Sequence, residues 1–455
     1  MNKIIFKAFI LTIALFILLS NLTFSQSQEE KIKQLEKRIE QLEAEISKLQ
    51  AIGKQEEEII QMIEALKEEV RRLRLEVAMP EIELKSYFGL GPAASKIYYT
   101  PRGLSIAGYG EITYENYLDQ SKTDRGDVLR FIPYIGYKFT DNILVNSELE
   151  IEHAGISNVG DRKPEVYVEF LYVDFLLSSG FNIRTGLFLI PISRMNEYHE
   201  PPVYFGTLRP DVERFVIPTV WRELGVMVYG ELFSGLSYKA GIMNGLRTDL
   251  IGDWIGAGRQ RGATVNFDKF AGILRFDFTP IKNLTLGASF YSSGGSDAAG
   301  ASPKGSAEAK FGLLTFDGQL QFENLLVKGL FAYGSADGNS FYTNRAGRAS
   351  KVYGWYVEAG YNLIPLIYPE SIVSFSPFVR YERYDLNRNV FVGDTDPKKN
   401  RSVFTFGIDF KPHPQVVIKA DYQLRNTSSS LPAGVGSGKD EWKIDQFNIG
   451  LGFIF

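Results

Sequence analysis

Residues 191–220 carry charged side chains of both signs at close spacing, and they form the longest connection that we expect between strands. Rings of charge at the narrowest section of a water-filled pore select which ions pass. The same charges could instead pair with one another and pin the segment to a wall, and the sequence leaves both options open. The candidates for a constriction are Arg194, Glu197, Glu200, Arg209, Asp211, Glu213, Arg214 and, just beyond the segment, Arg222; His199 lies among them.

A second set of charges falls on alternate positions of predicted strands, on the face that also holds glycine and other polar residues. Opposite charges on neighbouring strands stabilise a sheet by up to about 1 kcal/mol per pair, so a structural ladder is one explanation. A track of arginines that attracts anions is the other. The candidates for this wall are Arg130, Lys138, Glu148, Glu150, Arg184, Arg275, Arg380, Lys419 and Arg425, and Lys411 has the same parity.

Nothing in the sequence predicts an enzyme. It contains no Gly-x-Ser-x-Gly elbow, no zinc-binding pair of histidines and no phosphate-cradling loop. There are no cysteines, and three scattered histidines, His153, His199 and His413, argue against a metal site, so we expect no cofactor and no metal. The formal net charge of −4 gives no reason to expect a nucleic acid partner.

The elements that must position these charges are strands. Large apolar residues alternate with polar residues and glycine, as in Phe404–Phe410, Val416–Arg425 and Leu129–Phe139. The alternation breaks around Glu169 and Asp174, which predicts a bulge or a contact between protomers there. We place sixteen strands, at 105–117, 126–140, 143–154, 164–178, 181–190, 221–232, 236–246, 262–279, 284–293, 307–322, 325–334, 350–363, 373–384, 401–412, 415–426 and 442–455.

The connections between these strands alternate short and long, as in an outer-membrane β-barrel with short periplasmic turns and longer external loops. The last strand puts Phe447, Ile449, Leu451, Phe453 and Phe455 on one face and two glycines on the other. We therefore predict an all-β fold: a 16-stranded antiparallel transmembrane β-barrel, with apolar side chains facing the lipid bilayer.

Aromatic residues support this orientation. We expect Trp442, Phe447, Phe453 and Phe455 at the outer, interfacial positions of the barrel. Phe455, as the last residue, resembles the terminal signal that barrel-insertion machinery reads.

The region before the barrel divides into three parts. Residues 1–25 have a charged start, a short apolar run and a small-x-small site, which predicts a signal peptide. Residues 27–79 have apolar residues at heptad spacing, which predicts an α-helical coiled coil in the periplasm. Pro80 ends this helix, residues 80–103 form a linker, and 104–455 form the barrel.

The coiled coil predicts that the chain is a homo-oligomer. Isoleucine at position a with leucine at position d, as in Ile32 and Leu35, favours a dimer. A single amphipathic helix is the alternative.

Several segments resemble the start of the bacterial porin family related to the phosphate-selective porins O and P: 89–96 (GLGPAASK), 103–106 (GLSI), 108–111 (GYGE), 148–153 (ELEIEH), 197–202 (EYHEPP), 208–213 (LRPDVE) and 217–223 (IPTVWRE). The resemblance covers the chain from about residue 80 and is most specific in 89–225. It implies a sixteen-stranded barrel, usually trimeric, through which solutes diffuse passively, and several members carry an N-terminal coiled coil. The loops here contain no dense lysine cluster, which such phosphate-selective members place around the pore.

Together, these patterns predict an outer-membrane porin for small hydrophilic solutes, with anions preferred and a trimer favoured by the resemblance. The alternative is a structural protein that links the outer membrane to the periplasm and has a narrow or plugged lumen.

Overall fold

The computed structural model describes residues 84–154, 165–296, 309–338 and 346–455, together with a few positions between 33 and 67. The chain divides into two units, Met1–Glu83 and Leu84–Phe455. In the first unit the few described positions, Lys37 and Arg38 among them, are helical. Most of the predicted coiled coil and the whole predicted signal peptide lie outside the described residues. No helix among the described residues is both long enough and apolar enough to cross a membrane.

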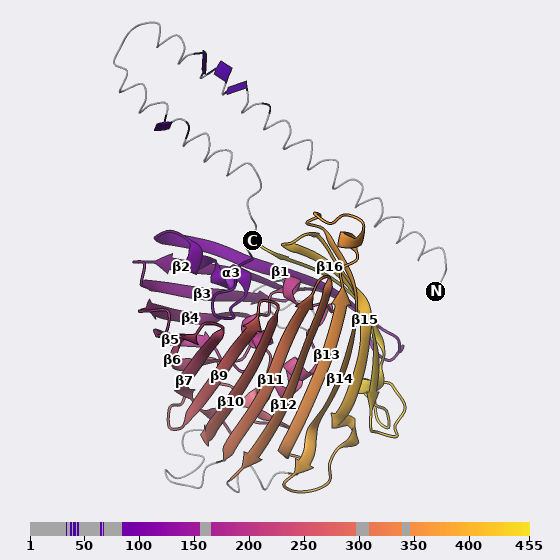
Figure 1. Ribbon diagram of the computed structural model, residues 1–455. Helices are drawn as coiled ribbons and strands as arrows, with labels where there is room; N and C mark the ends of the chain where they lie inside the picture. Colours follow the sequence, from indigo (N-terminus) through magenta and orange to yellow (C-terminus); the bar gives the residue numbers. More distant parts are fainter. Residues whose placement is uncertain are drawn as a thin grey trace. The chain divides into compact units, whose positions relative to one another are not determined.

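The second unit is a closed barrel of sixteen antiparallel strands (Figure 1), as the alternation predicts. Each strand pairs with its neighbour in sequence, and β1 pairs with β17 to close the cylinder. The short β8 lies outside this order and pairs in parallel with the end of β10. The strands are β1 Gly103–Tyr117, β2 Arg125–Lys138, β3 Ile143–Glu152, β4 Val166–Leu176, β5 Asn182–Leu189, β6 Arg222–Phe233, β7 Leu236–Asn244, β8 Leu246–Arg247, β9 Phe270–Ile281, β10 Leu284–Ser296, β11 Lys310–Phe322, β12 Leu325–Asp337, β13 Ala349–Tyr361, β14 Ser374–Val390, β15 Asn400–His413, β16 Val416–Thr427 and β17 Gln446–Ile454.

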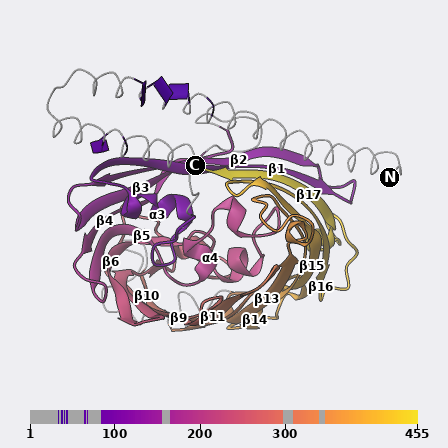
Figure 2. The same ribbon diagram turned by 45° about the horizontal axis from the view of Figure 1, so that its top comes forward.

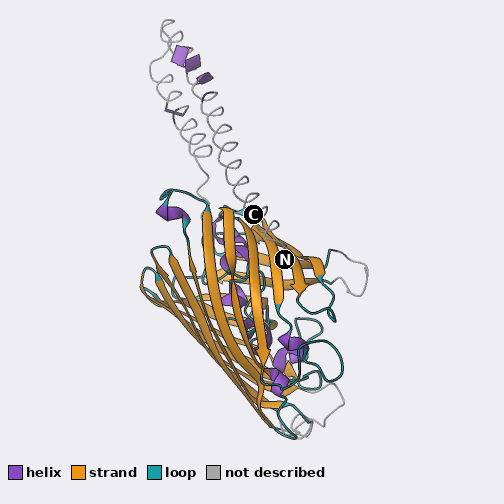
Figure 3. Cartoon of the chain, turned by 90° about the vertical axis from the view of Figure 1, so that its right-hand side faces the viewer, coloured by secondary structure: helices purple, strands orange, loops and turns teal. Residues whose placement is uncertain are grey.

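Three predicted strand boundaries are wrong by four residues or more. The strand expected at 373–384 continues to Val390, because Asn389 and Val390 still pair with Lys351 and Ala349 of β13 in an irregular register. The strand expected at 262–279 begins only at Phe270, because 262–269 form turns with Thr264 in a left-handed backbone conformation. The strand expected at 442–455 begins at Gln446, because the short helix η6, Glu441–Lys443, precedes it. The longest connection, 190–221, begins and ends at the end of the barrel opposite the C-terminus, whereas 362–373, which contains η4 Ile364–Leu366, lies at the same end as the C-terminus (Figure 3).

The two faces of the strands have the predicted orientation. In β2 the side chains of Phe131, Ile135 and Tyr137 point outward and are 44%, 48% and 45% exposed, whereas Ile132 and Tyr134 are buried inside. The outer surface is therefore a broad apolar face, and the polar residues line the interior, as in a barrel that faces lipid.

The predicted break in alternation in β4 is a β-bulge. Glu148 lies opposite Phe170 and Leu149 opposite Val168, so Glu169 is the extra residue of the bulged strand. A bulge changes the direction in which a side chain points. Here it brings Glu169, which is fully buried, to the inner side of the wall next to Glu148.

The glycines of the last strand make room for a segment inside the barrel. A Cβ atom added at Gly452 would lie 2.4 Å from Cβ of Pro201, and one added at Gly450 would lie 2.9 Å from Cγ2 of Thr207. Residues 201–207 therefore lie directly against the inner face of β17. This packing explains why the inner face of that strand carries no larger side chains there.

Residues 190–221 fold into the lumen as a chain of short helical turns (Figure 2). These turns are α4 Arg194–Glu197, η1 Pro201–Val203 and the π-helical turn η2 Val212–Val216. The backbone of the segment is held by two different parts of the wall, since Thr315 on β11 donates a hydrogen bond to the carbonyl of Ile192 and Asp421 on β16 accepts one from the backbone N–H of Thr207. The predicted inward-folded segment is therefore present.

Part of the stretch expected to be a linker also lies against the inner wall. Pro92–Tyr99 form helix α3, which contacts β1, β2 and β3. Its Ile97 would be 2.9 Å from a Cβ atom at Gly136, and its Tyr98 hydroxyl is 3.0 Å from the Tyr172 hydroxyl. Helix α3 and the segment 190–221 together narrow the lumen. The remaining short helices are η3 Ile255–Gly258, η4 Ile364–Leu366 and η5 Pro397–Lys399.

Candidate functional site: two cationic cavities in the lumen

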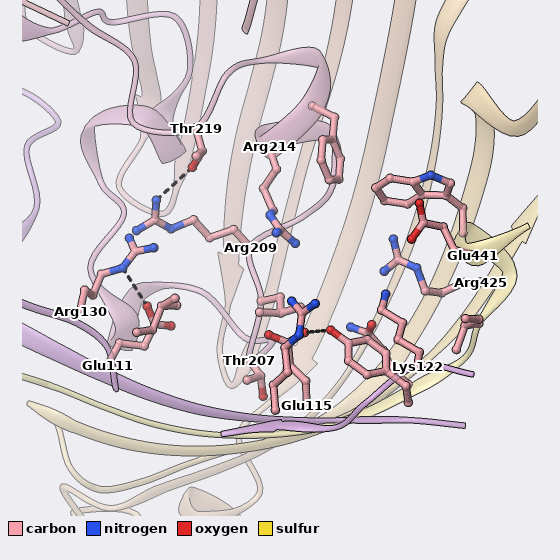
Figure 4. Close-up of a pocket in the computed structure, with 18 of the residues that line it drawn as sticks. Glu111, Glu115, Lys122, Arg130, Thr207, Arg209, Arg214, Thr219, Arg425 and Glu441 are labelled. Atoms are coloured by element: carbon pink, nitrogen blue, oxygen red, sulfur yellow. Dashed lines mark hydrogen bonds and ion pairs between the residues drawn. The ribbon is translucent and has the colours of Figure 1, made fainter. Parts of the chain in front are cut away.

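A cavity of about 470 Å³ opens inside the barrel near the end that carries the long connections; we call it the long-loop cavity (Figure 4). Cations outnumber anions among its lining residues. Its cationic residues are Lys122, Arg125, Arg130, Arg209, Arg214 and Arg425, and its carboxylates are Glu111, Glu115 and Glu441.

A second cavity of about 320 Å³, the short-turn cavity, lies near the other end, where Leu326 and Pro414 mark the short turns. Arg194, Lys328 and Lys411 line it, and none of the described residues lining it is a carboxylate. Both cavities therefore carry an excess of positive charge.

Tyr204 lines both cavities and separates them. Its side chain is buried and held in place from two directions. The hydroxyl donates a hydrogen bond of 2.6 Å to Oε1 of Glu111 on β1, and Nζ of Lys419 on β16 lies 3.6 Å from the ring centroid. Lys419 also donates to the carbonyl of Gly206 at 3.0 Å, which ties the backbone beside Tyr204 to the wall.

Three of the predicted constriction residues face these cavities. Arg194 lines the short-turn cavity and its guanidinium lies 4.9 Å from the Tyr198 ring centroid. Arg209 lines the long-loop cavity and donates to Thr219 Oγ1 at 3.1 Å. Arg214 lines the same cavity, and its side chain is 36% exposed.

The other predicted constriction residues are buried in pairs that hold the segment. Glu197 pairs with Lys239 of β7 at 2.5 Å. Glu200 accepts hydrogen bonds from the backbone N–H groups of Ala93 and Ala94 at 3.1 and 3.0 Å and so caps the N-terminus of α3. Burial raises the pKa of Glu200 to about 7. Glu197 and Glu200 therefore contact the wall and α3 rather than either cavity.

The pairing continues at η2. Asp211 pairs with Arg425 and accepts a hydrogen bond of 2.9 Å from the Tyr384 hydroxyl. Glu213 accepts a hydrogen bond of 2.7 Å from Ser193, and burial raises the pKa of Glu213 to about 8. These contacts connect η2 to the β14–β16 side of the wall and to the start of the inward segment.

Arg222 also points away from the cavities. Its guanidinium lies 4.5 Å from the Tyr167 ring centroid and donates to the carbonyl of Val220 at 3.3 Å. Arg222 thus packs between β4 and β6.

Most of the predicted wall residues are buried inside the barrel, and most are paired. Arg130 and Arg425 line the long-loop cavity, where Arg130 lies 3.6 Å from Glu111. The other arginines are covered by the interior segments. Their partners are Asp174 for Arg184, Asp277 and Asp317 for Arg275, and Glu382 for Arg380, while Lys411 pairs with Asp409.

The glutamate row of β3 behaves differently from the predicted ladder. Only Glu152 comes within 4.0 Å of Arg130, whereas Lys138 donates to the carbonyls of Tyr98 and Thr100 at the C-terminus of α3. Glu148 and Glu150 are buried on the inner side of β3. Pairing of opposite charges between neighbouring strands therefore accounts for Glu152 alone among the three glutamates of β3.

Two aromatic predictions have opposite outcomes. Phe455 lies on the outer face, and its backbone N–H donates to the carbonyl of Gly108 at 2.9 Å, which completes the β1–β17 seam. The outward placement of Trp442 is wrong, because Trp442 lines the long-loop cavity with its ring centroid 3.4 Å from the Arg401 guanidinium. The turn at η6 interrupts the strand, so strand parity does not apply to this residue.

No protein-family model matches the chain. Over 371 residues, which are 77% of this chain and 82% of the relative, the sequence is 38% identical to an uncharacterized protein of Aquifex aeolicus (strain VF5). The chain belongs to the family of that protein. It shares its barrel fold with solved outer-membrane proteins of much lower identity.

OmpF of Salmonella typhi, solved in complex with daunomycin, has 10% identity and a TM-score of 0.51 over 77% of this chain and 97% of its own. A loop-deletion form of OmpT, an outer membrane protein of Vibrio cholerae, has 11% identity and a TM-score of 0.50 over 77% and 99%. At these identities the likeness shows the fold alone.

The sequence patterns missed Tyr204, Glu111 and Lys328. Glu111 and Lys328 both lie at inward positions of strands, so parity could have found them. Tyr204 lies in an irregular segment without periodicity, and only the folded chain shows that it reaches both cavities.

Proposed function

We propose that this chain is an outer-membrane porin that lets small hydrophilic solutes diffuse passively and prefers anions. The observation that carries the proposal is the pair of cavities, each lined by more cations than carboxylates and separated from the other by Tyr204. Sixteen-stranded barrels are wide enough for an aqueous channel. Charge around a narrow section then decides which ions enter.

The permeation path that we propose runs from the long-loop cavity, past Tyr204, into the short-turn cavity. Arg209 stands on the long-loop side of this passage, and its guanidinium lies 5.9 Å from the Tyr204 ring centroid. Lys419 is buried against the same ring, with its Nζ 3.6 Å from the ring centroid. A small anion would therefore meet positive charge before, at and after the narrowest point.

The test is single-channel conductance in planar bilayers for the wild type, Tyr204→Ala and Tyr204→Phe. Tyr204→Ala removes the ring between the cavities and should raise the conductance. Tyr204→Phe keeps the ring and loses only the hydrogen bond to Glu111, worth about 1 kcal/mol, so its conductance should stay near that of the wild type. Equal conductance in all three proteins would contradict this path.

The structural linker remains the second candidate, because α3 and the inward segment occupy much of the lumen. A linker would give no steady open channel in the same bilayers, either as wild type or as Tyr204→Ala. Loss of envelope integrity after deletion of 27–79, with conductance of the barrel unchanged, would favour a linking role for that segment.

The remaining expectations belong to the same proposal. Residues 1–25 direct export, 27–79 form a periplasmic coiled coil that holds protomers together, and Phe455 serves the barrel-insertion machinery. The resemblance of 89–225 to the phosphate-selective porins O and P supports a trimer, which analytical ultracentrifugation in detergent would check against the dimer favoured by the heptads. We extend the proposal to small anions in general rather than to phosphate.

A further inference from the structure

Three buried side chains from separate parts of the chain converge behind the inward segment. Glu148 comes from β3, Glu169 from the bulge of β4, and His199 from the residues that follow α4. His199 Nε2 lies 3.9 Å from Oε1 of Glu148 and 3.8 Å from Oε1 of Glu169, and one donor atom from each residue lies within 4.8 Å of the others. The three side chains are at most 2% exposed.

The donor atoms of this cluster accept no hydrogen bond from an N–H or hydroxyl group of the described residues, and the carboxyl groups of Glu148, Glu169 and Glu150 lie close enough to share protons with one another. The buried atoms that accept no such hydrogen bond are both oxygens of Glu148, both oxygens of Glu169 and Nε2 of His199. Buried carboxylates are normally paired or bound to a metal, because an unpaired buried charge is costly. Three such groups at one place are therefore a feature that needs a partner.

His199 is oriented as a ligand. Its Nδ1 lies 3.1 Å from the backbone carbonyl of Asn196, so Nδ1 carries the proton and donates, and Nε2 presents its lone pair to the two carboxylates. Metal-ligating histidines show this arrangement, in which the second ring nitrogen donates to a carbonyl.

The neighbouring arginines form no ion pair with the cluster, although the Arg222 guanidinium is near enough to Glu169 and Glu148 to attract both carboxylates. Arg222 packs on Tyr167, and Arg130 pairs with Glu111 and Glu152. Among the described residues no lysine or arginine forms an ion pair with Glu148 or Glu169, and the basic side chain within 4.0 Å of them is the neutral imidazole of His199. A cation from solution would supply the missing partner.

We propose that Glu148, Glu169 and His199 bind one divalent transition-metal ion, with Zn²⁺ as the best fit. One imidazole nitrogen and two carboxylate oxygens are donors that Zn²⁺ accepts, whereas Ca²⁺ takes six to eight oxygens. His199 Nε2 lies 3.9 and 3.8 Å from the two carboxylate oxygens, and those oxygens lie within 4.8 Å of each other. An ion equidistant from the three donors would therefore lie at most about 2.5 Å from each, within a small adjustment of zinc–ligand distances.

The ion would join two parts of the barrel that otherwise only pack together. Two ligands belong to the wall and the third belongs to the inward segment, ten residues before Arg209 in the chain. The His199 carbonyl also accepts a hydrogen bond of 3.2 Å from Nη2 of Arg209. A metal at this site would therefore fix the position of a cation that lines the long-loop cavity.

The experiment is metal binding by the full-length mature protein, purified in detergent and stripped with EDTA. Titration with Zn²⁺ against a competing chromophoric chelator should show one site. Glu169→Gln and His199→Gln should each lower the affinity by at least about tenfold. His413→Gln, which removes a histidine from a short turn far from the cluster, is the matched control and should bind as the wild type does.

The proposal would be overturned by equal Zn²⁺ affinity in the wild type and in Glu169→Gln. It would also be overturned if the wild type had no Zn²⁺ site, which is the result expected if the two carboxylates share a proton instead of binding a metal. If the variants do not fold, Co²⁺ titration of the wild type decides. Visible absorption from bound Co²⁺ that Zn²⁺ removes supports the site, and its absence contradicts it. Neither measurement depends on conductance, so the result is independent of the proposed channel.

Discussion

Neutralising Arg214 is the most direct test of which charges select ions. Its guanidinium borders the long-loop cavity, and its carboxylate neighbour at 3.5 Å, Asp211, keeps Arg425 and Tyr384 as partners when Arg214 is changed. Arg214→Gln should therefore remove one charge from the passage without loosening η2. Arg194→Gln does the same in the short-turn cavity, where no carboxylate of the described residues pairs with Arg194.

The expected size follows from Coulomb's law. A monovalent ion that passes about 5 Å from a guanidinium in water interacts with it by about 0.8 kcal/mol. Screening at about 0.1 M salt, where the Debye length is about 10 Å, reduces this to about 0.5 kcal/mol. The charge attracts an anion and repels a cation equally, so the interaction energies of the two ions differ by about 1 kcal/mol. Removing the charge should therefore change the anion-to-cation permeability ratio about fivefold.

The assay is the reversal potential across a planar bilayer under a KCl gradient near this ionic strength. Both variants should shift the reversal potential toward lower anion preference, and the shift should shrink as salt is raised. Arg102→Gln is the control, since Arg102 pairs with Asp141 on the exposed short-turn surface and lines neither cavity. An unchanged reversal potential in both Arg214→Gln and Arg194→Gln would refute the reasoning.

Three further predictions concern stability and assembly. Gly452→Ala places a methyl group 2.4 Å from Pro201 and should lower the free energy of unfolding in urea by about 1–3 kcal/mol. The control Gly126→Ala has open space around the new methyl group and should leave the free energy of unfolding unchanged. Equal stability of the two variants would show that η1 does not pack tightly against β17. Glu213 titrates near pH 8 when folded and near 4.5 when unfolded, so the folded state holds the extra proton and stability should fall as pH rises through this window. Glu213→Gln should flatten that slope in pH-dependent unfolding, and an unaltered slope would assign it to other groups. Deletion of Phe455 removes the hydrogen bonds with Gly108 at the β1–β17 seam and the aromatic ring that stacks on Phe131. The deletion should lower the fraction of heat-resistant, assembled protein on gels. Full assembly without Phe455 would contradict its role as a terminal signal.

The sequence by itself determined the barrel. Alternation with a period of two is a local property of extended backbone, so the parity of residues such as Phe131 and Lys419 could be read without knowing their neighbours. Loop lengths then separated the two ends of the barrel and set the number of strands. Parity failed only where the backbone is not a regular strand, as at Trp442 in η6.

Tertiary structure alone decided which inward charges are available. Glu200 caps a helix more than one hundred residues earlier in the chain, and Asp211 meets Arg425 across 214 residues. The meeting of Glu148, Glu169 and His199 depends on a bulge and on the path of an irregular segment. Periodicity tells which face a side chain occupies, but closing the barrel and folding a segment into it determine which side chains meet, and neither leaves a local pattern in the sequence.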